Sequence, residues 1–118
     1  MQLDIDLVRE LLARVDRQPH DADSIDLSIN GYTEETVADH VRLLDGLGYV
    51  TAVSLWTFQG NVWKSIRITW KGADFLTRAR DDAAWNRARQ MVEERVVGNS
   101  DFKLDVLKGL LDAAAEEL

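Results

Sequence analysis

The sequence predicts a one-domain α+β fold in which helices flank a single β-hairpin. Three observations lead to this prediction. Apolar residues recur at helical spacing near both ends of the chain, two runs in the middle are rich in β-branched and aromatic residues, and capping residues or glycines separate the segments. A length of 118 residues suits one domain with its own hydrophobic core.

The first helix is expected to begin after Asp4 and to end near Arg17. Asp4 can serve as the N-cap, and an apolar stripe follows it at helical spacing. Pro19 disfavours helix at the residue before it, which sets the end. In residues 25–29 apolar and polar side chains alternate, so we expect a short half-buried strand before the turn at residues 30–31.

The second helix is predicted between Thr33 and Gly48. Thr33 can cap it, and Glu34 and Glu35 place negative charge in its first turn, where the helix dipole favours it. Gly48 suits the C-terminal cap. His40 lies on the inner side of this helix. We expect a partly buried histidine beneath the hairpin, hydrogen-bonded to backbone, in preference to a ligand or a pH sensor.

Two strands are predicted at residues 49–58 and 62–70, joined by a turn at residues 59–61, where the sequence reads Gln-Gly-Asn. Trp70 ends the second strand. We expect Trp70 and Trp85 in the core, closing the junction between the hairpin and the helices that follow.

Trp56, Phe58 and Trp63 cluster around the predicted turn, and two interpretations stay open. Trp56 and Trp63 can lie near each other across the strands and stabilise the hairpin. Alternatively, the three aromatic side chains stay exposed and anchor a protein partner.

Three helical segments are expected after the hairpin. Thr69 can cap the first, Asp81 and Asp82 the second, and residues 98–100 break the chain before the third. The last helix can fold back on the first helix or pair with a second copy of the chain, and we expect a homodimer through it. Its apolar stripe comprises Phe102, Val106, Leu107, Leu110, Leu111 and Ala114.

This order of elements resembles a winged helix whose helix-turn-helix is reduced, because the segment before the hairpin has room for only one helix. The predicted domain has a winged-helix-like core at residues 1–80 and a C-terminal helical extension at residues 81–118. Residues 66–72, Ile-Arg-Ile-Thr-Trp-Lys-Gly, resemble the strand-Thr-x-x-Gly close of many wings. The capped helix, His-aliphatic pair and Gly-aliphatic exit of winged helices are matched by Thr33, Val37, His40, Val41, Leu44, Gly48, Tyr49 and Val50.

Nearly the whole chain also resembles a bacterial and phage family, domain of unknown function 2513. The resemblance implies carriage by prophages and mobile elements. It implies no activity, and it assigns no functional residues. The matching segments are residues 4–12, 31–35, 40–44, 68–76 and 79–85.

Catalytic, metal and cofactor sites are not expected. The chain has no cysteine, and His20 and His40 are far apart in sequence, so no metal motif is present. Asp81 and Asp82 are the most tempting carboxylate pair, but neighbours on a helix point about 100° apart and do not converge on one atom. No apolar run is long enough to span a bilayer, and the N-terminus lacks the order of a signal peptide, so we expect a cytoplasmic protein.

The charge distribution decides the expected function. The net charge is −7; residues 33–50 carry −3, whereas residues 51–80 carry +4. Acids on the second helix would oppose phosphates in a major-groove docking. We therefore expect a non-catalytic module of phage or mobile-element type that acts through protein contacts, as an acidic inhibitor or modulator of a basic nucleic-acid-handling protein. The expected partner-binding residues are Glu34, Glu35, Asp39, Trp56, Phe58 and Trp63.

The alternative is a transcriptional regulator that contacts DNA through its basic wing. In this case phosphates would meet Arg42 of the second helix, Lys64 and Arg67 of the second strand, and Lys71 beyond it. Continuous positive charge across these four side chains would favour the regulator. Isolated bases in an acidic surface would favour protein binding.

Overall fold

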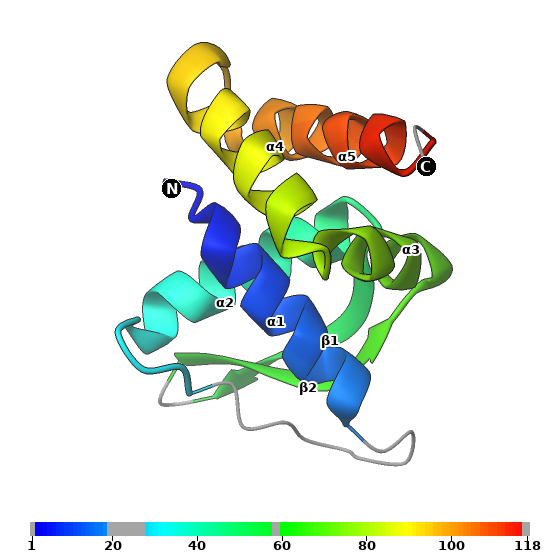
Figure 1. The fold of residues 1–118 in the computed structure, drawn as a ribbon. Coiled ribbons are helices and arrows are strands. Elements are labelled where there is room, and N and C mark those ends of the chain that lie inside the picture. The colour runs from blue at the N-terminus through cyan, green and yellow to red at the C-terminus, as the bar shows by residue number, and fades with distance from the viewer. Residues whose placement is uncertain (1, 19–27, 58–59, 117–118) are drawn as a thin grey trace.

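The computed structural model describes residues 2–18, 28–57 and 60–116 and confirms an α+β fold (Figure 1). A two-stranded antiparallel sheet lies against α1 at one side of the molecule, and α4 and α5 lie at the other. In chain order the elements are α1 Ile5–Arg17, α2 Glu34–Gly46, β1 Val50–Thr57, β2 Gly60–Ile68, α3 Trp70–Ala79, α4 Asp82–Arg95 and α5 Ser100–Glu116.

The predicted caps hold the first two helices. The Asp4 carboxylate accepts the Leu7 N–H at 3.0 Å, and α1 ends at Arg17 as predicted. The Thr33 hydroxyl accepts the Thr36 N–H at 3.1 Å at the start of α2. The strand predicted at residues 25–29 lies mostly outside the described residues, and the part that is described belongs to no strand.

The end of α2 is a Schellman motif, which confirms the glycine exit. Gly48 has a φ of +82°, a left-handed conformation that glycine adopts without strain. The Tyr49 N–H bonds the Leu44 carbonyl at 2.9 Å, and the Gly48 N–H bonds the Asp45 carbonyl at 3.2 Å. This turn directs Tyr49 into the core, where its side chain is fully buried.

The second strand begins two residues earlier than predicted, and the hairpin contains a bulge. Thr57 pairs with Gly60, so residues 60–61 of the predicted turn belong to β2. The register shifts between the pairs Thr51–Arg67 and Val53–Lys64, which leaves one extra residue in β2. Ser65 lies at this shift with a φ of +53°, so it takes the left-handed conformation of a β-bulge.

A chain of three aromatic rings joins the hairpin to the C-terminal helices. Tyr49 and Phe75 pack edge to face with ring centroids 5.2 Å apart, and Phe75 and Trp85 do so at 6.2 Å. The Trp85 indole N–H donates to the Asp6 carboxylate at 3.1 Å, which ties α4 to α1. The expectation that Trp85 is a core residue is confirmed, since its exposure is 0%.

The expectation for Trp70 was wrong, because its side chain is 89% exposed. The reason is the phase of α3. Its buried positions are Gly72, Phe75, Leu76 and Ala79. At about 100° per residue, Trp70 lies about 200° from Gly72 and therefore on the opposite side of the helix.

The last helix packs on its own chain. Its main contacts are with α3 and α4, through the buried side chains of Leu104, Leu107 and Leu111. Phe102, which was expected in this stripe, is 52% exposed. The homodimer through this helix stays a prediction, and Leu107 belongs to the core of the single chain.

Candidate functional site: an acidic groove beside α2

Three cavities run into one another along the exposed side of α2. Their volumes are about 530, 730 and 330 Å³. Each shares lining residues with the other two, so together they form one groove between the N-terminal segment, α2, α4 and the start of α5. We call it the α2 groove; the residues common to two of its cavities are Gln2, Leu3, Asp39, Leu43, Glu93 and Asp101.

The lining of the α2 groove is acidic and partly apolar. Leu3, Leu43 and Leu47 supply apolar surface. The lining contains five carboxylates and two basic side chains, a formal charge of −3. These are Asp4, Asp6, Asp39, Glu93 and Asp101, with Arg42 and Lys103.

The ion pairs around the groove are long, and their carboxylates stay in contact with solvent. Asp39 lies 3.8 Å from Arg42, and Glu93 lies 3.6 Å from Arg89. The Asp39 and Glu93 side chains are 35% and 52% exposed. Exposed pairs of this kind contribute little to stability, so these carboxylates can exchange their present partners for a cation from another molecule.

The carboxylates of the groove also affect the hydroxyl of Tyr32. Tyr32 lines the first cavity. Burial, a hydrogen bond to Asp4 and the charges of Asp4 and Asp6 all raise the pKa of the Tyr32 hydroxyl above its usual value. The charges of Asp4 and Asp6, which contribute to this rise after burial, also favour a positive charge beside Tyr32.

His40 borders the same cavity but has no free nitrogen. It is fully buried; Nε2 accepts the Asp4 N–H at 2.9 Å, and Nδ1 lies 2.8 Å from the Thr36 carbonyl, to which it donates. The expected hydrogen bonding of His40 to backbone is confirmed, but the side chain is fully and not partly buried, and its partners are the α1 cap Asp4 and Thr36 of α2, not the hairpin. With both ring nitrogens engaged, His40 positions the start of α1 against α2.

Of the three acids predicted to bind a partner, only Asp39 lies in the α2 groove. Glu34 and Glu35 are exposed in the first turn of α2. Glu34 borders a small cavity at the other end of α2, next to residues 28–32, which shares Tyr32 with the first cavity of the groove. The predicted acidic face of α2 is therefore divided between two places.

The predicted aromatic cluster is only partly described. Phe58 and the side chain of Trp56 lie outside the described residues. Trp63 is half-buried, packs against the core and pairs with Ser54 across the strands. For Trp63 these contacts favour the stabilising interpretation.

The four bases predicted to meet DNA do not form a continuous cluster. Arg42 pairs with Asp39. The Lys71 ammonium donates to the Leu47 carbonyl at 2.8 Å and lies 4.5 Å from the centre of the Tyr49 ring. Lys71 thereby holds the end of α2. Lys64 is exposed on β2, and Arg67 donates to the Ile66 carbonyl of its own strand at 3.1 Å.

The Thr-x-Lys-Gly sequence at residues 69–72 joins the start of α3 to the end of α2. The Thr69 hydroxyl lies 2.6 Å from the Gly48 carbonyl and accepts the Gly72 N–H at 3.1 Å. A Cβ on Gly72 would lie 2.1 Å from the Tyr49 carbonyl oxygen, so only glycine allows this approach. Thr69, Lys71 and Gly72 all bind α3 to the end of α2, whereas the side chain of Trp70 is exposed to solvent.

No group of three or more metal-ligating side chains occurs among the described residues. Asp81 caps α4 through the Ala83 and Ala84 N–H groups, and Asp82 pairs with Arg9 at 3.0 Å, so both have structural partners. Within the described part of the chain, no helix is long and apolar enough to cross a membrane.

The groove residues that sequence analysis missed come from distant segments. Gln2, Leu3, Glu93 and Asp101 lie far from α2 in the chain. They meet it because the end of α4 and the start of α5 lie beside α2 in the folded chain. None of them carries a local signal, since an isolated carboxylate on a helix resembles any solvated residue.

Two comparisons place the chain among known proteins, while no solved structure matches it. An uncharacterized protein from Haemophilus influenzae is 26% identical over 109 residues, which cover 92% of this chain and 90% of that protein. A family model described as hypothetical protein (DUF2513) matches residues 2–98, from the N-terminal segment through α4. The chain therefore belongs to the DUF2513 family.

Proposed function

We propose that this chain is a non-catalytic, winged-helix-like protein-binding module that holds a basic segment of a protein partner in the α2 groove. The observation that carries the proposal is the continuity of three cavities along α2 with a lining charge of −3. A segment with lysine or arginine on one side and leucine-sized residues on the other would complement the carboxylates and the leucines of the lining.

The surroundings of α2 favour the binding of a protein over the insertion of α2 into the major groove of DNA. In a helix-turn-helix docking the second helix lies in the DNA groove. Here Asp39 and Arg42 form a wall of the α2 groove beside Glu93 and Asp101. Duplex phosphates docked there would meet three carboxylates, and the nearby base Arg42 already pairs with Asp39. A phage-type factor that modulates a basic nucleic-acid-handling protein fits this charge.

The alternative, a regulator that contacts DNA through the hairpin, has less support in the geometry. Of its four bases, Arg42 has a carboxylate partner and Lys71 holds a helix end. Only Lys64 and Arg67 remain to meet phosphates. Two contacts supply too little counterion release for tight duplex binding at physiological salt.

The test uses a fluorescein-labelled amphipathic Lys/Leu peptide and anisotropy at low and physiological salt. The triple variant Asp39→Asn, Glu93→Gln, Asp101→Asn should weaken binding at least about tenfold, because it removes three groove carboxylates. The matched control, Asp74→Asn, Glu94→Gln, Asp105→Asn, changes the net charge equally at exposed acids outside the cavity linings. Equal weakening by both variants would mean that the peptide responds to net charge, and the groove proposal would fail.

A further inference from the structure

The hairpin and the residues that flank it contain basic side chains but no acids. Residues 46–73 contain no acid and three bases, Lys64, Arg67 and Lys71, in a chain with 21 acids. The remaining residues carry a net charge of −10. The hairpin is thus a basic element in an acidic protein, and its charge is complementary to a polyanion.

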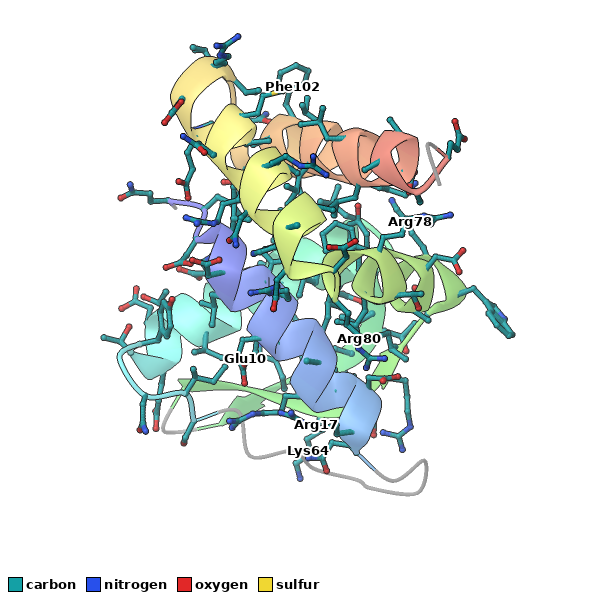
Figure 2. All side chains as sticks on the ribbon, viewed as in Figure 1. Glu10, Arg17, Lys64, Arg78, Arg80 and Phe102 are labelled. Carbon is teal, nitrogen blue, oxygen red and sulfur yellow. The ribbon has the colours of Figure 1, made fainter. Side chains whose placement is uncertain are left out.

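The outer side of the hairpin is open to solvent. Val50 and Ile66 face the core, whereas Thr51, Val53 and Lys64 are exposed. Lys64 pairs with Val53 across the strands, so both lie on the same outer side. Figure 2 shows Lys64 at the edge of the molecule far from α4 and α5.

Trp70 follows this strand directly and has no role in the described fold. Its neighbours Thr69, Lys71 and Gly72 each bind α3 to the end of α2, but the Trp70 side chain is 89% exposed. Exposing an indole to water forgoes the stabilisation that its burial would give. An exposed aromatic ring close in the chain to basic side chains can bind unpaired nucleobases by stacking.

We propose that the outer side of the hairpin binds a single-stranded nucleic acid, with phosphates at Lys64 and Arg67 and a base stacked on Trp70. The seven residues from Lys64 to Trp70 reach at most roughly 20 Å of extended chain, so one short single strand can contact all three side chains. A single strand is favoured over a duplex because stacking on Trp70 requires an unpaired base, and because two phosphate contacts are too few for a duplex. This surface does not overlap the α2 groove.

Anisotropy of a fluorescein-labelled oligothymidylate about eight nucleotides long tests the proposal. Two phosphate contacts predict that log K falls against log salt with a slope of about −1.4, and Lys64→Ala should reduce the slope to about −0.7. Trp70→Ala should weaken binding by about 5- to 150-fold, and Trp70→Tyr should restore most of it, because a base can stack on either ring. Circular dichroism confirms that each variant is folded.

Two matched controls separate the hairpin from general surface effects. Phe102→Ala removes an exposed aromatic ring at the opposite end of the molecule (Figure 2), and Arg87→Ala removes an exposed base of α4. Both should bind the strand as the wild type does. Unchanged affinity in Trp70→Ala, equal or tighter binding of a duplex or of polyglutamate, or no binding at about 1 mM protein would each overturn the proposal.

Discussion

At Gly72, a neighbouring backbone atom leaves no room for any side chain. Because its Cβ would lie 2.1 Å from the Tyr49 carbonyl oxygen, Gly72→Ala must separate α3 from the end of α2. We expect a loss of about 3 kcal/mol in the free energy of unfolding, measured by urea denaturation. Gly46→Ala is the control, since nothing lies within 4 Å of its Cβ position, and it should stabilise α2 by about 0.5–1 kcal/mol. A Gly72→Ala protein as stable as the wild type would show that this approach does not hold the two helices.

Tyr49 makes the free energy of unfolding depend on pH in the alkaline range. Burial, followed by the charges of Asp105 and Asp112, raises the pKa of its hydroxyl from 10.0 to about 12. The folded state therefore holds this proton more tightly than the unfolded state. Its contribution is complete below pH 10 and is lost as the pH rises from 10 to about 12.

Tyr49→Phe should abolish that part of the alkaline loss. The hydroxyl has no hydrogen-bond partner among the described residues, so the variant should match or exceed the wild-type stability at pH 8. Urea unfolding of both proteins from pH 8 to 12 measures the difference. Parallel stability curves over this range would contradict the assignment to Tyr49.

The roles of single residues were predictable where contacts within a few residues determine them. They were not predictable where burial depends on which side of a helix faces the core. Asp4, Thr33, Thr69 and Asp81 were predictable as caps, because an N-cap acts within three residues of itself. Trp70 was assigned to the core from its size alone. Its exposure follows from the phase of α3, which the close approach at Gly72 sets through contacts distant in sequence.

At the scale of elements, the bulge in β2 determines which hairpin side chains face outward. It shifts the register so that Lys64 pairs with Val53, and it holds Ser65 at a φ of +53°. Ser65→Val should cost about 1–2 kcal/mol, because a β-branched residue is strained in this conformation. Ser65→Gly should be neutral or stabilising.

Thr51→Val, at an exposed position of the opposite strand, is the control and should change stability by less than about 0.5 kcal/mol. Urea denaturation of the three variants provides the comparison. If Ser65→Val and Ser65→Gly were equally stable, the left-handed bulge would not be a feature of the folded protein.

The helices and strands were largely predictable as elements, and their contacts were not. Periodicity predicted each helix because burial of one face repeats every turn. The last helix shows the limit. Of its predicted stripe, Leu107 and Leu111 are buried, but Phe102 is exposed and the buried Leu104 was not included, since the facing surfaces of α3 and α4 select the buried side.

At the scale of the whole molecule, opposite charges occupy separate surfaces. The α2 groove gathers carboxylates from the N-terminal segment, α2, α4 and α5, and the hairpin carries bases without acids. Sequence analysis predicted the acidic α2 and the basic hairpin because each is continuous in the chain. It could not predict the groove, whose walls meet only through the packing of α4 and α5.

The α2 groove as a protein-binding site is tested most directly by ¹H–¹⁵N chemical-shift mapping with a basic amphipathic Lys/Leu peptide. The amides of Leu3, Asp39, Leu43, Glu93 and Asp101 should shift together and saturate with one affinity, while those of Val50–Thr57 and Gly60–Ile68 should stay unchanged. Shifts confined to the hairpin, or no shifts at a saturating excess of peptide, would contradict the proposed function.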